Sequence, residues 1–132
     1  MQPAPNDEFN LSVGVDPAGG VVAPSEQPLV LELSDDSFDS AVMNNGLMLV
    51  DFWAPWCSPC IALTPLLEEI ARDNAGKVVL GKLNIDENPV TPSKLGVQGI
   101  PTIFITRKGE VLDCFVGAIP KADLMRRVSP FL

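Results

Sequence analysis

From residue 29 onward, hydrophobic and polar residues follow patterns that predict regular secondary structure. Three apolar runs predict β-strands, over 29–33, 47–53 and 78–85. The run over 47–53 is almost uninterrupted, which is typical of a central strand covered on both faces. Apolar residues at helical spacing predict two helices between these strands. One has Ser34 as its N-cap and stops at 44–46, and the other extends over 58–74.

The second half of the chain predicts a β-hairpin and a last helix. Apolar runs over 102–106 and 110–116 flank Arg107-Lys108-Gly109, which has the composition of a turn. A proline-containing loop with one helical turn at 93–95 precedes them, and Pro120 opens the last helix. Helices between the early strands require parallel pairing, whereas the hairpin pairs antiparallel. We therefore predict an α/β fold, a three-layer α/β/α sandwich around a central mixed sheet.

The first 28 residues differ in composition from the rest. They hold five of the 13 prolines, four of the 17 acidic residues and none of the 9 basic ones, so half of the net charge of −8 lies there. We predict an acidic, flexible N-terminal extension over 1–28 and a globular domain over 29–132. The alternative is a short strand around 11–15 or 20–22 that pairs with the edge of the domain's sheet.

Composition excludes several functional classes. The excess of 17 acidic over 9 basic residues argues against a nucleic-acid partner. Because the chain has no histidine and three cysteines, it lacks Ser–His–Asp and Cys–His sites and the usual zinc ligand sets. It shows no secretory signal and no apolar run of about 18 residues, so we expect a cytoplasmic protein without a membrane partner. We also expect a monomer that binds no metal.

Thiols and carboxylates remain as reactive groups, and two cysteines stand where the central strand gives way to the second helix. Cys57 and Cys60 are three residues apart, so in a helix's first turn they share a face and can close a small disulfide ring. Backbone N–H groups and the helix dipole there stabilise an anion, which lowers a thiol pKa from about 8.5 toward roughly 3.5–7.5. Pro59 fits this turn because its missing N–H is not needed. The pattern favours a redox-active dithiol, with Cys57 as nucleophile and Cys60 as resolving thiol.

Three other interpretations of the cysteine pair are open. A half zinc site would need two further ligands, and the sequence has no second cysteine pair and no histidine. A purely structural disulfide is disfavoured in a reducing cytoplasm. Two inert core thiols would be an unusual use of a site beside Trp56 and Pro59 at a helix start.

The third cysteine, Cys114, lies outside this motif. On the last strand it alternates with Leu112 and Val116, which predicts that the three side chains share one face. We therefore predict a buried, inert thiol rather than a regulatory one.

Several motifs in order make the chain resemble the thioredoxin family from about 29 to 132. They are Val50-Asp-Phe-Trp-Ala-Pro-Trp-Cys-Ser-Pro-Cys60, Lys82-Leu-Asn-Ile-Asp86, Gly99-Ile-Pro-Thr102 and Val116-Gly117. The resemblance implies the thioredoxin fold and protein-disulfide reductase activity at Cys57 and Cys60, contributing to electron transport and cell redox homeostasis. It implies no bound cofactor, since the Cys57–Cys60 disulfide is itself the redox group. It also implies disulfide-containing client proteins and thioredoxin reductase as partners.

The resemblance gives roles to residues around the pair. Cys57 resembles the exposed attacking cysteine and Cys60 the buried one. Asp51 resembles the carboxylate beneath the disulfide that assists proton transfer to or from Cys60, and Lys82 resembles the lysine paired with it. An aspartate buried among apolar neighbours favours its neutral form, so its pKa should rise. The alternatives are an exposed strand-end residue for Asp51 and a plain polar strand residue for Lys82.

Other positions resemble the family's client-binding surface. Ile100-Pro101 resembles the cis-proline turn that faces the dithiol, although from sequence alone it is a turn before a strand. The shallow apolar rim where partners dock corresponds to Trp56, Gly99, Ile100, Gly117 and Ala118. Ser58 stands where the commonest motif has glycine, and Ile61 where a basic residue is frequent. With Pro59, these two residues should modulate the reactivity of the thiol.

Two hypotheses compete with a reductase. Ser58 leaves room for an oxidase or isomerase in a more oxidising compartment, which a higher redox potential would reveal. The other is a non-enzymatic scaffold whose acidic extension recruits a partner. That scaffold would keep redox activity and lose a specific complex when residues 1–28 are deleted.

Overall fold

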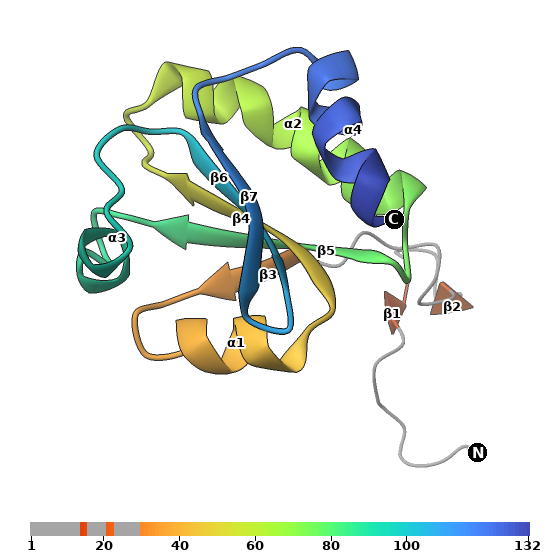
Figure 1. Cartoon of the computed structure of the whole chain (residues 1–132), viewed down its shortest axis with the longest axis horizontal. Helices are drawn as coiled ribbons and strands as arrows, with labels where there is room; N and C mark the ends of the chain where they lie inside the picture. The colour runs from red at the N-terminus through yellow and green to blue at the C-terminus, as the bar shows by residue number, and fades with distance from the viewer. Residues whose placement is uncertain (1–13, 16–20, 23–29) are drawn as a thin grey trace.

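The computed structural model of the chain describes residues 14–15, 21–22 and 30–132 (Figure 1). Within them the main sheet has five strands in the order β3-β5-β4-β6-β7. The strands are β3 (Val30–Leu33), β4 (Leu47–Trp53), β5 (Val78–Asn84), β6 (Thr102–Arg107) and β7 (Glu110–Val116). β3, β5 and β4 are parallel, and β6 and β7 extend the sheet antiparallel. The predicted mixed sheet is confirmed.

Helices cover both faces of this sheet. They are α1 (Phe38–Asn44), α2 (Ser58–Asp73), α3 (Val90–Lys94) and α4 (Lys121–Val128), and a short 3-10 turn follows at Ser129–Phe131. α2 and α4 lie together along one face, with α1 on the other and α3 toward one end of the sheet (Figure 1). This arrangement is the predicted three-layer α/β/α sandwich.

The alternation of side chains along β4 divides the interior into two cores. Leu47 and Leu49 pack in the core beneath α2 and α4. Met48, Val50 and Phe52 point the other way, into the core beneath α1. Residue 51 therefore faces α2, close to the end of the strand from which that helix starts.

Two short strands precede the main sheet in the chain. β1 (Gly14–Val15) and β2 (Val21–Val22) pair antiparallel with each other in a separate sheet. The alternative prediction, that one of them pairs with the edge of the main sheet, is therefore wrong for the described residues. The predicted flexibility of the rest of 1–28 lies outside the described residues.

The first helix begins later than predicted, because its expected first turn is used by other contacts. The backbone N–H of Ser37 donates to the Ser34 hydroxyl at 3.1 Å, which closes a turn ahead of α1. The Asp35 carboxylate accepts from the backbone N–H groups of Val90 at 3.1 Å and Thr91 at 2.7 Å. Asp35 therefore holds the start of α3 and does not serve its own helix.

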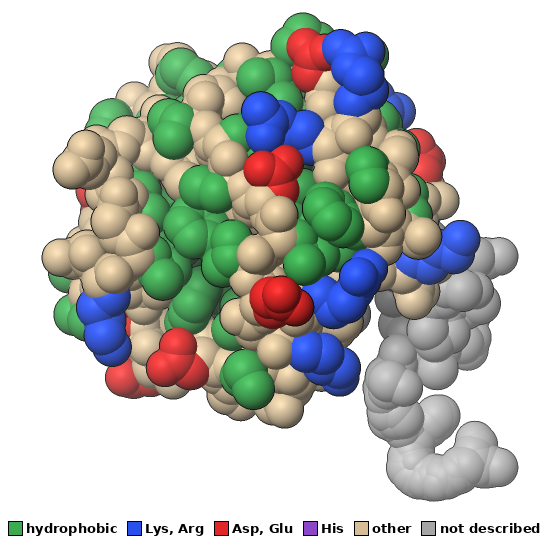
Figure 2. Space-filling model, in the orientation of Figure 1, with side chains coloured by type: hydrophobic (Ala, Val, Ile, Leu, Met, Phe, Trp, Pro, Cys, Tyr) green, Lys and Arg blue, Asp and Glu red, His purple; other side chains and the backbone are tan. Residues whose placement is uncertain are grey.

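The face that carries α1 and α3 is not completely covered. Hydrophobic side chains gather in a hollow between α3 and β7 (Figure 2). Val97, Phe104 and Val116 are among the residues that line it. This hollow lies on the opposite side of the sheet from α2 and α4.

Candidate active site

The two cysteines of the motif lie at the start of α2. Cys57 is the N-cap with an extended backbone, and its Sγ accepts a hydrogen bond from the backbone N–H of Cys60 at 3.3 Å. The two sulfur atoms are bonded, and the Cα atoms are 5.3 Å apart, within the range usual for disulfides. The predicted disulfide-forming pair is confirmed, and Pro59 occupies the first turn of the helix as expected.

The two cysteines differ in burial. Cys60 is fully buried, whereas Cys57 keeps 5% of its surface exposed. The side chains of Trp53, Ile85 and Ile100 pack around the pair. Cys57 is thus more covered than the resemblance implied, because these apolar groups surround it, but it is the one of the two that reaches the surface.

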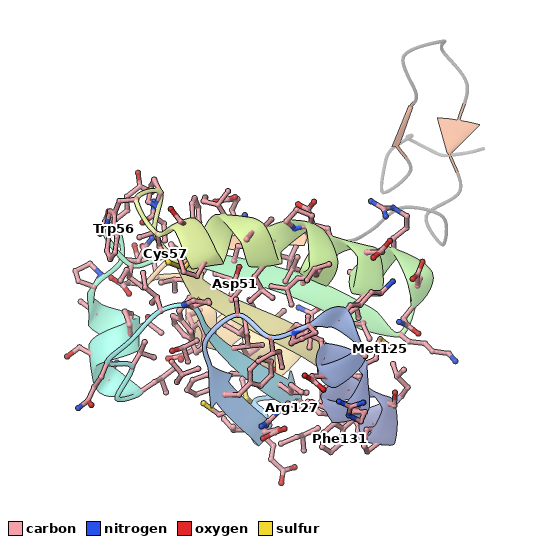
Figure 3. The ribbon with its side chains drawn as sticks, turned by 90° about the horizontal axis from the view of Figure 1, so that it is seen from above. Asp51, Trp56, Cys57, Met125, Arg127 and Phe131 are labelled. Atoms are coloured by element: carbon pink, nitrogen blue, oxygen red, sulfur yellow. A yellow bond between two sulfur atoms is a disulfide. The ribbon has the colours of Figure 1, made fainter. Side chains whose placement is uncertain are left out.

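Asp51 is fully buried on β4, on the face that α2 covers (Figure 3). Neither of its carboxylate oxygens has a hydrogen-bond partner among the described residues. Burial raises the pKa of Asp51 from 3.8 to about 7, and the charge of Lys82 opposes that rise. The predicted burial and the predicted direction of the shift are confirmed, and this carboxyl can gain or lose a proton near neutral pH.

Lys82 stands beside Asp51 but does not form the ion pair that the resemblance implied. The parallel register of β4 and β5 places Lys82 opposite Asp51. The Lys82 Nζ atom instead lies 4.5 Å from the centroid of the Trp53 ring, a cation–π contact. Because Trp53 also packs against the cysteines, Lys82 acts on the site through its charge and through this ring.

The predicted rim residues are only partly brought together. Trp56, Gly99 and Ile100 line a hollow of about 320 Å³ beside the disulfide. Trp56 is 67% exposed, and its Nε1 donates to the two oxygens of Asp86 at 3.0 and 3.2 Å. Ala118 is exposed but does not line this hollow. Ser58, between the cysteines, is exposed as well.

Two further predicted residues, Pro101 and Gly117, contact each other at the turn before β6. The Ile100–Pro101 peptide bond is cis, as the resemblance implied. The backbone N–H of Gly117 donates to the carbonyl oxygen of Pro101 at 2.8 Å, and Gly117 has φ +100°, a conformation that favours glycine. These contacts place the end of β7 next to the turn that follows Gly99.

Cys114 is exposed, so the prediction of a buried thiol is wrong. With Val116, its side chain lines the hollow that α1 and α3 leave uncovered. The predicted alternation also fails at Leu112, because a bulge in the β6–β7 pairing matches Ile105 with Asp113 but Thr106 with Val111. The extra residue, Leu112, packs toward α4, and Cys114 then faces the opposite side of the sheet.

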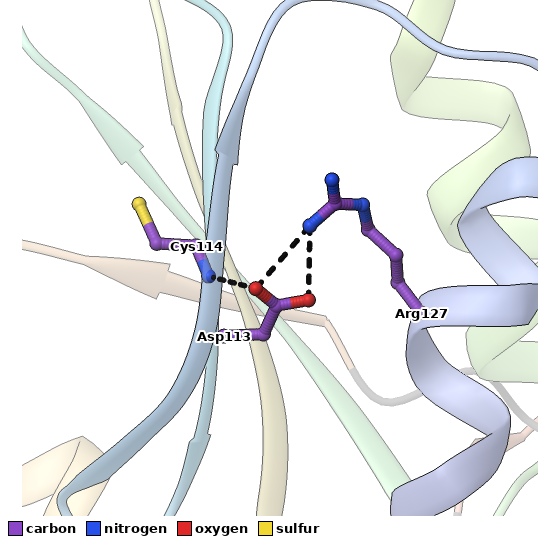
Figure 4. A network of polar contacts seen from close by, with 3 residues as sticks. All are labelled: Asp113, Cys114 and Arg127. Carbon is purple, nitrogen blue, oxygen red and sulfur yellow. Dashed lines mark hydrogen bonds and ion pairs between the residues drawn. The ribbon is translucent and has the colours of Figure 1, made fainter.

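The surroundings of Cys114 are charged. Its backbone N–H donates to the Asp113 carboxylate at 2.8 Å, and Arg127 holds that carboxylate with contacts of 3.0 and 3.2 Å (Figure 4). Partial burial and the neighbouring Asp113 raise the pKa of the Cys114 thiol, while Arg127 opposes that rise. A raised pKa leaves little thiolate at neutral pH, so an inert thiol stays a prediction, for a different reason from burial in the core.

Two residues of the site were not singled out from the sequence. Trp53 packs against the disulfide and receives the Lys82 ammonium, and its only sequence signal was the aromatic end of a long apolar run. Asp86 holds the Trp56 ring, and its signal was its place in the motif that begins at Lys82.

The described part of the chain has no cluster of three or more His, Cys, Asp or Glu side chains that could hold a metal ion. Within residues 30–132 and the two short strands, no helix is both long enough and apolar enough to cross a membrane.

Comparisons with known proteins agree with the geometry. The family model for thioredoxin matches residues 29–129. A thioredoxin of Haemophilus influenzae is 46% identical over 101 residues, which cover 76% of this chain and 94% of that protein. A thioredoxin of Rhodospirillum rubrum is 49% identical over 99 residues, covering 74% and 95%. An M-type chloroplastic thioredoxin of Pisum sativum is 43% identical over 101 residues, covering 76% and 59%.

The family match covers most of the chain, and the cysteine pair, the buried aspartate and the cis-proline turn occupy one end of the sheet. Proteins of this family exchange thiols and disulfides through their own cysteine pair and need no bound cofactor. The chain belongs to the thioredoxin family of thiol–disulfide oxidoreductases.

Proposed function

We propose that this protein reduces disulfides in client proteins, with Cys57 as the nucleophile and Cys60 as the resolving thiol. The observation that carries the proposal is the disulfide across the first turn of α2, in which Cys57 alone of the pair has accessible surface. A helix N-terminus favours the anionic form of a thiol, and the Cys60 N–H already points at the Cys57 sulfur.

The reaction proceeds by two exchanges. In the reduced protein the Cys57 thiolate attacks one sulfur of the client disulfide, which forms a mixed disulfide and releases a client thiolate. Cys60 then loses its proton and attacks the Cys57 sulfur, which breaks the mixed disulfide and releases the second client thiolate. The client gains two electrons, and its two thiolates take up one proton that Cys60 gave up and one from water, while the Cys57–Cys60 pair is left as the disulfide seen in the structure.

Asp51 serves as the proton acceptor for Cys60 in the second exchange. Its pKa of about 7 supports this role, because a carboxyl that titrates near neutral pH can take up a proton and return it at little cost. Lys82 tunes Asp51, since its positive charge keeps the pKa of the carboxyl from rising further. Ser58 and Pro59, the two residues between the cysteines, influence the redox potential of the pair.

Clients dock on the surface beside Cys57. Trp56, Gly99 and Ile100 share the hollow next to the disulfide, which supports their assignment to this surface. Pro101 and Gly117 shape its border through their backbone hydrogen bond, and Ala118 continues that border as an exposed residue.

Family membership implies disulfide-bearing client proteins and thioredoxin reductase as partners. We assign the protein to the cytoplasm, because a reducing compartment keeps the dithiol reduced, and fractionation of the native host tests this assignment.

The protein works as a monomer without nucleic acid or membrane, with an extension over 1–28 and a domain over 29–132. A complete site within one chain and the acidic balance support this, and light scattering with and without DNA or vesicles tests it.

The roles of the cysteines are tested by dithiothreitol-driven reduction of insulin. We expect Cys57→Ser and Cys60→Ser to fall to the uncatalysed rate, with Cys114→Ser, the matched control, unchanged. Cys60→Ser should accumulate a mixed disulfide with insulin, and Cys57→Ser should not. Serine variants as active as the wild type would contradict the proposal.

The direction of the reaction is tested by the equilibrium potential of the cysteine pair against glutathione. A reductase should have a potential below the cytosolic glutathione range of roughly −220 to −260 mV. A value far above that range would instead indicate an oxidase or isomerase.

A further inference from the structure

A separate hollow of about 250 Å³ lies between α1 and the β6–β7 hairpin. Its lining shares no residue with the hollow beside the disulfide, so the proposed function leaves it unexplained. Phe38, Val42 and Phe104, which belong to the core beneath α1, form apolar walls. Asp39 and Thr106 are the polar side chains of the lining. A few polar groups in an otherwise apolar hollow are typical of a site that orients a small molecule.

A short side chain on the inner face of β6 leaves room for this hollow. Thr106 is opposite Met48 on β4, and Met48 faces the same core as Phe104. Alternation along β6 therefore turns Thr106 toward α1, two residues after Phe104. Threonine fills less of the space between strand and helix than the aromatic ring of Phe104 does.

Thr106 places a hydroxyl at the buried end of the hollow. The residue is 2% exposed, and its Oγ1 atom has no hydrogen-bond partner among the described residues. A buried hydroxyl without a partner is unfavourable, because it has given up its hydrogen bonds to water. Since this oxygen can both donate and accept, a neutral hydroxyl of a ligand satisfies it, whereas a charged group at that depth would be costly.

Asp39 places a carboxylate at the open end of the hollow. It is exposed in the first turn of α1. None of the ion pairs in the described part of the chain involves it. A cation beside this carboxylate keeps part of its water, so pairing there adds a modest attraction without the cost of burying a charge. The open end therefore favours a cationic group.

The hollow is preformed, because its walls are held together by backbone contacts. The backbone N–H of Lys108 donates to the carbonyl oxygen of Asn45 at 3.0 Å, which ties the hairpin turn to the end of α1. At the next residue, Gly109, a Cβ atom would collide with the sulfur of Met43, so glycine lets this side chain lie over the turn. Met43 is 57% exposed and Val111 is 50% exposed, and both line the outer part of the hollow.

We propose that this hollow binds a small amino alcohol, a short aliphatic chain with a hydroxyl at one end and an ammonium at the other. The hydroxyl pairs with the Thr106 Oγ1 atom, the chain lies between the apolar walls, and the ammonium stays at the open end near Asp39. Burial sets this order, because the neutral group takes the buried end and the charged group the hydrated one. The hollow is smaller than sites for drug-sized ligands, which span roughly 300–1,000 Å³, so a chain of about five carbons suits it.

The test titrates the full-length oxidised protein with aminopentanol, whose amine and hydroxyl stand at opposite ends of the chain. Two-dimensional NMR of the backbone amides gives the residues affected and the dissociation constant. Pentanol lacks the ammonium, pentylamine lacks the hydroxyl, and hydroxypentanoate carries a carboxylate in place of the ammonium. We expect aminopentanol to bind at the lining residues in the millimolar range, and pentanol and pentylamine each to bind about two- to tenfold more weakly. Hydroxypentanoate should bind weakest.

Two results of this titration would overturn the inference. One is the absence of any shift at the lining residues. The other is equal affinity for aminopentanol and pentylamine, which would mean that water alone satisfies the hydroxyl of Thr106.

Variants assign each contact. Thr106→Val keeps the shape of the side chain without its hydroxyl, so it should weaken binding of aminopentanol to the level of pentylamine, and Thr106→Ser should restore it. Asp39→Asn should weaken binding of aminopentanol and leave that of pentanol unchanged. Asp36→Asn is the matched control, because Asp36 is an exposed carboxylate outside the lining, and it should change neither. Unchanged affinity of Thr106→Val for aminopentanol would contradict the inference.

Stability and activity give independent readouts. Without ligand, Thr106→Val should be at least as stable as the wild type in thermal unfolding, because it removes an unpaired buried hydroxyl. A lower stability would show that the hydroxyl already has a partner within the fold, which would count against the site. All variants should reduce insulin at the wild-type rate. A wild type that fails to reduce insulin would therefore refute the proposed function and leave this inference standing on its own titration.

Discussion

The protein presents thiols in two environments, each with a carboxylate close by. Cys57 and Cys60 begin α2 above Asp51, which is fully buried and has no hydrogen-bond partner among the described residues. Cys114 lies on an exposed edge strand beside Asp113, which is held by Arg127. Both environments are built from the same residue types, but we expect only the first to support rapid thiol exchange.

The comparison teaches that accessibility and reactivity are separate properties of a thiol. Cys57 is 5% exposed, yet it sits where a helix N-terminus stabilises its anion. Cys114 is exposed, but partial burial and Asp113 raise the pKa of its thiol. The carboxylates differ as well. Burial raises the pKa of Asp51 to about 7, and the charge of Lys82 offsets only part of that rise.

The largest effect should come from removing the charge of Asp51. Its pKa is about 7 in the folded protein and 3.8 without burial. Between these values the unfolded chain is ionised while the folded one keeps its proton, so the burial of Asp51 lowers stability as pH rises from about 4 to about 7. Relative to wild type, the free energy of unfolding of Asp51→Asn should rise by on the order of 4 kcal/mol between pH 4 and pH 8.

Guanidinium unfolding of the oxidised proteins at pH 4, 6 and 8 measures this difference. Asp36→Asn, which alters an exposed carboxylate, is the matched control for the loss of one acidic group. If the free energies of unfolding of wild type and Asp51→Asn changed in parallel with pH, folding would not raise the pKa of Asp51. In that case the two cysteine environments would differ less than the structure indicates.

A smaller effect, at least about tenfold, should separate the two kinds of thiol during alkylation. In the reduced protein at pH 7, iodoacetamide should modify Cys57 faster than Cys114, because the thiolate is the reacting form. Mass spectrometry of the digested protein over time gives both rates in one sample. Equal rates, or faster modification of Cys114, would mean that exposure outweighs the helix N-terminus.

Much of the fold was predictable because local pattern and tertiary structure agree. The uninterrupted apolar run over 47–53 became the central strand, and the cysteine motif after it marked the start of α2. The disulfide and the burial of Asp51 followed from the same stretch of sequence. For the apolar run and the cysteine motif, each residue's own preference matches its surroundings, whereas the burial of Asp51 was implied by its apolar neighbours and by the family resemblance.

The failures came from contacts between distant segments. Ser34 was predicted as the N-cap of the first helix, but α1 begins at Phe38, and the next residue, Asp35, holds the start of α3. Cys114 was placed in the core by its alternation with Leu112 and Val116, but its face of β7 borders the open hollow beside α3. Lys82 was given an ion pair with Asp51, although the nearby Trp53 ring receives its ammonium. Hydrophobic periodicity and sequence motifs do not predict such contacts, because the contacts depend on which residues lie nearest in the folded chain.

The smallest expected effect tests the charges around Cys114. Asp113 raises the pKa of this thiol and Arg127 lowers it, so Asp113→Asn should speed its alkylation and Arg127→Met should slow it. Exposed charge pairs contribute less than about 1 kcal/mol, so we expect changes of about two- to fivefold, weaker at high salt. Methionine keeps an apolar side chain above the Phe115 ring, which Arg127 now covers at 4.8 Å. In the oxidised protein the other two cysteines are protected, so one alkylation rate reports on this site alone. If the alkylation rate of Cys114 rose in Asp113→Asn and fell in Arg127→Met, local charge would control that rate. If both rates stayed unchanged, partial burial of the thiol would be the cause of its slow alkylation.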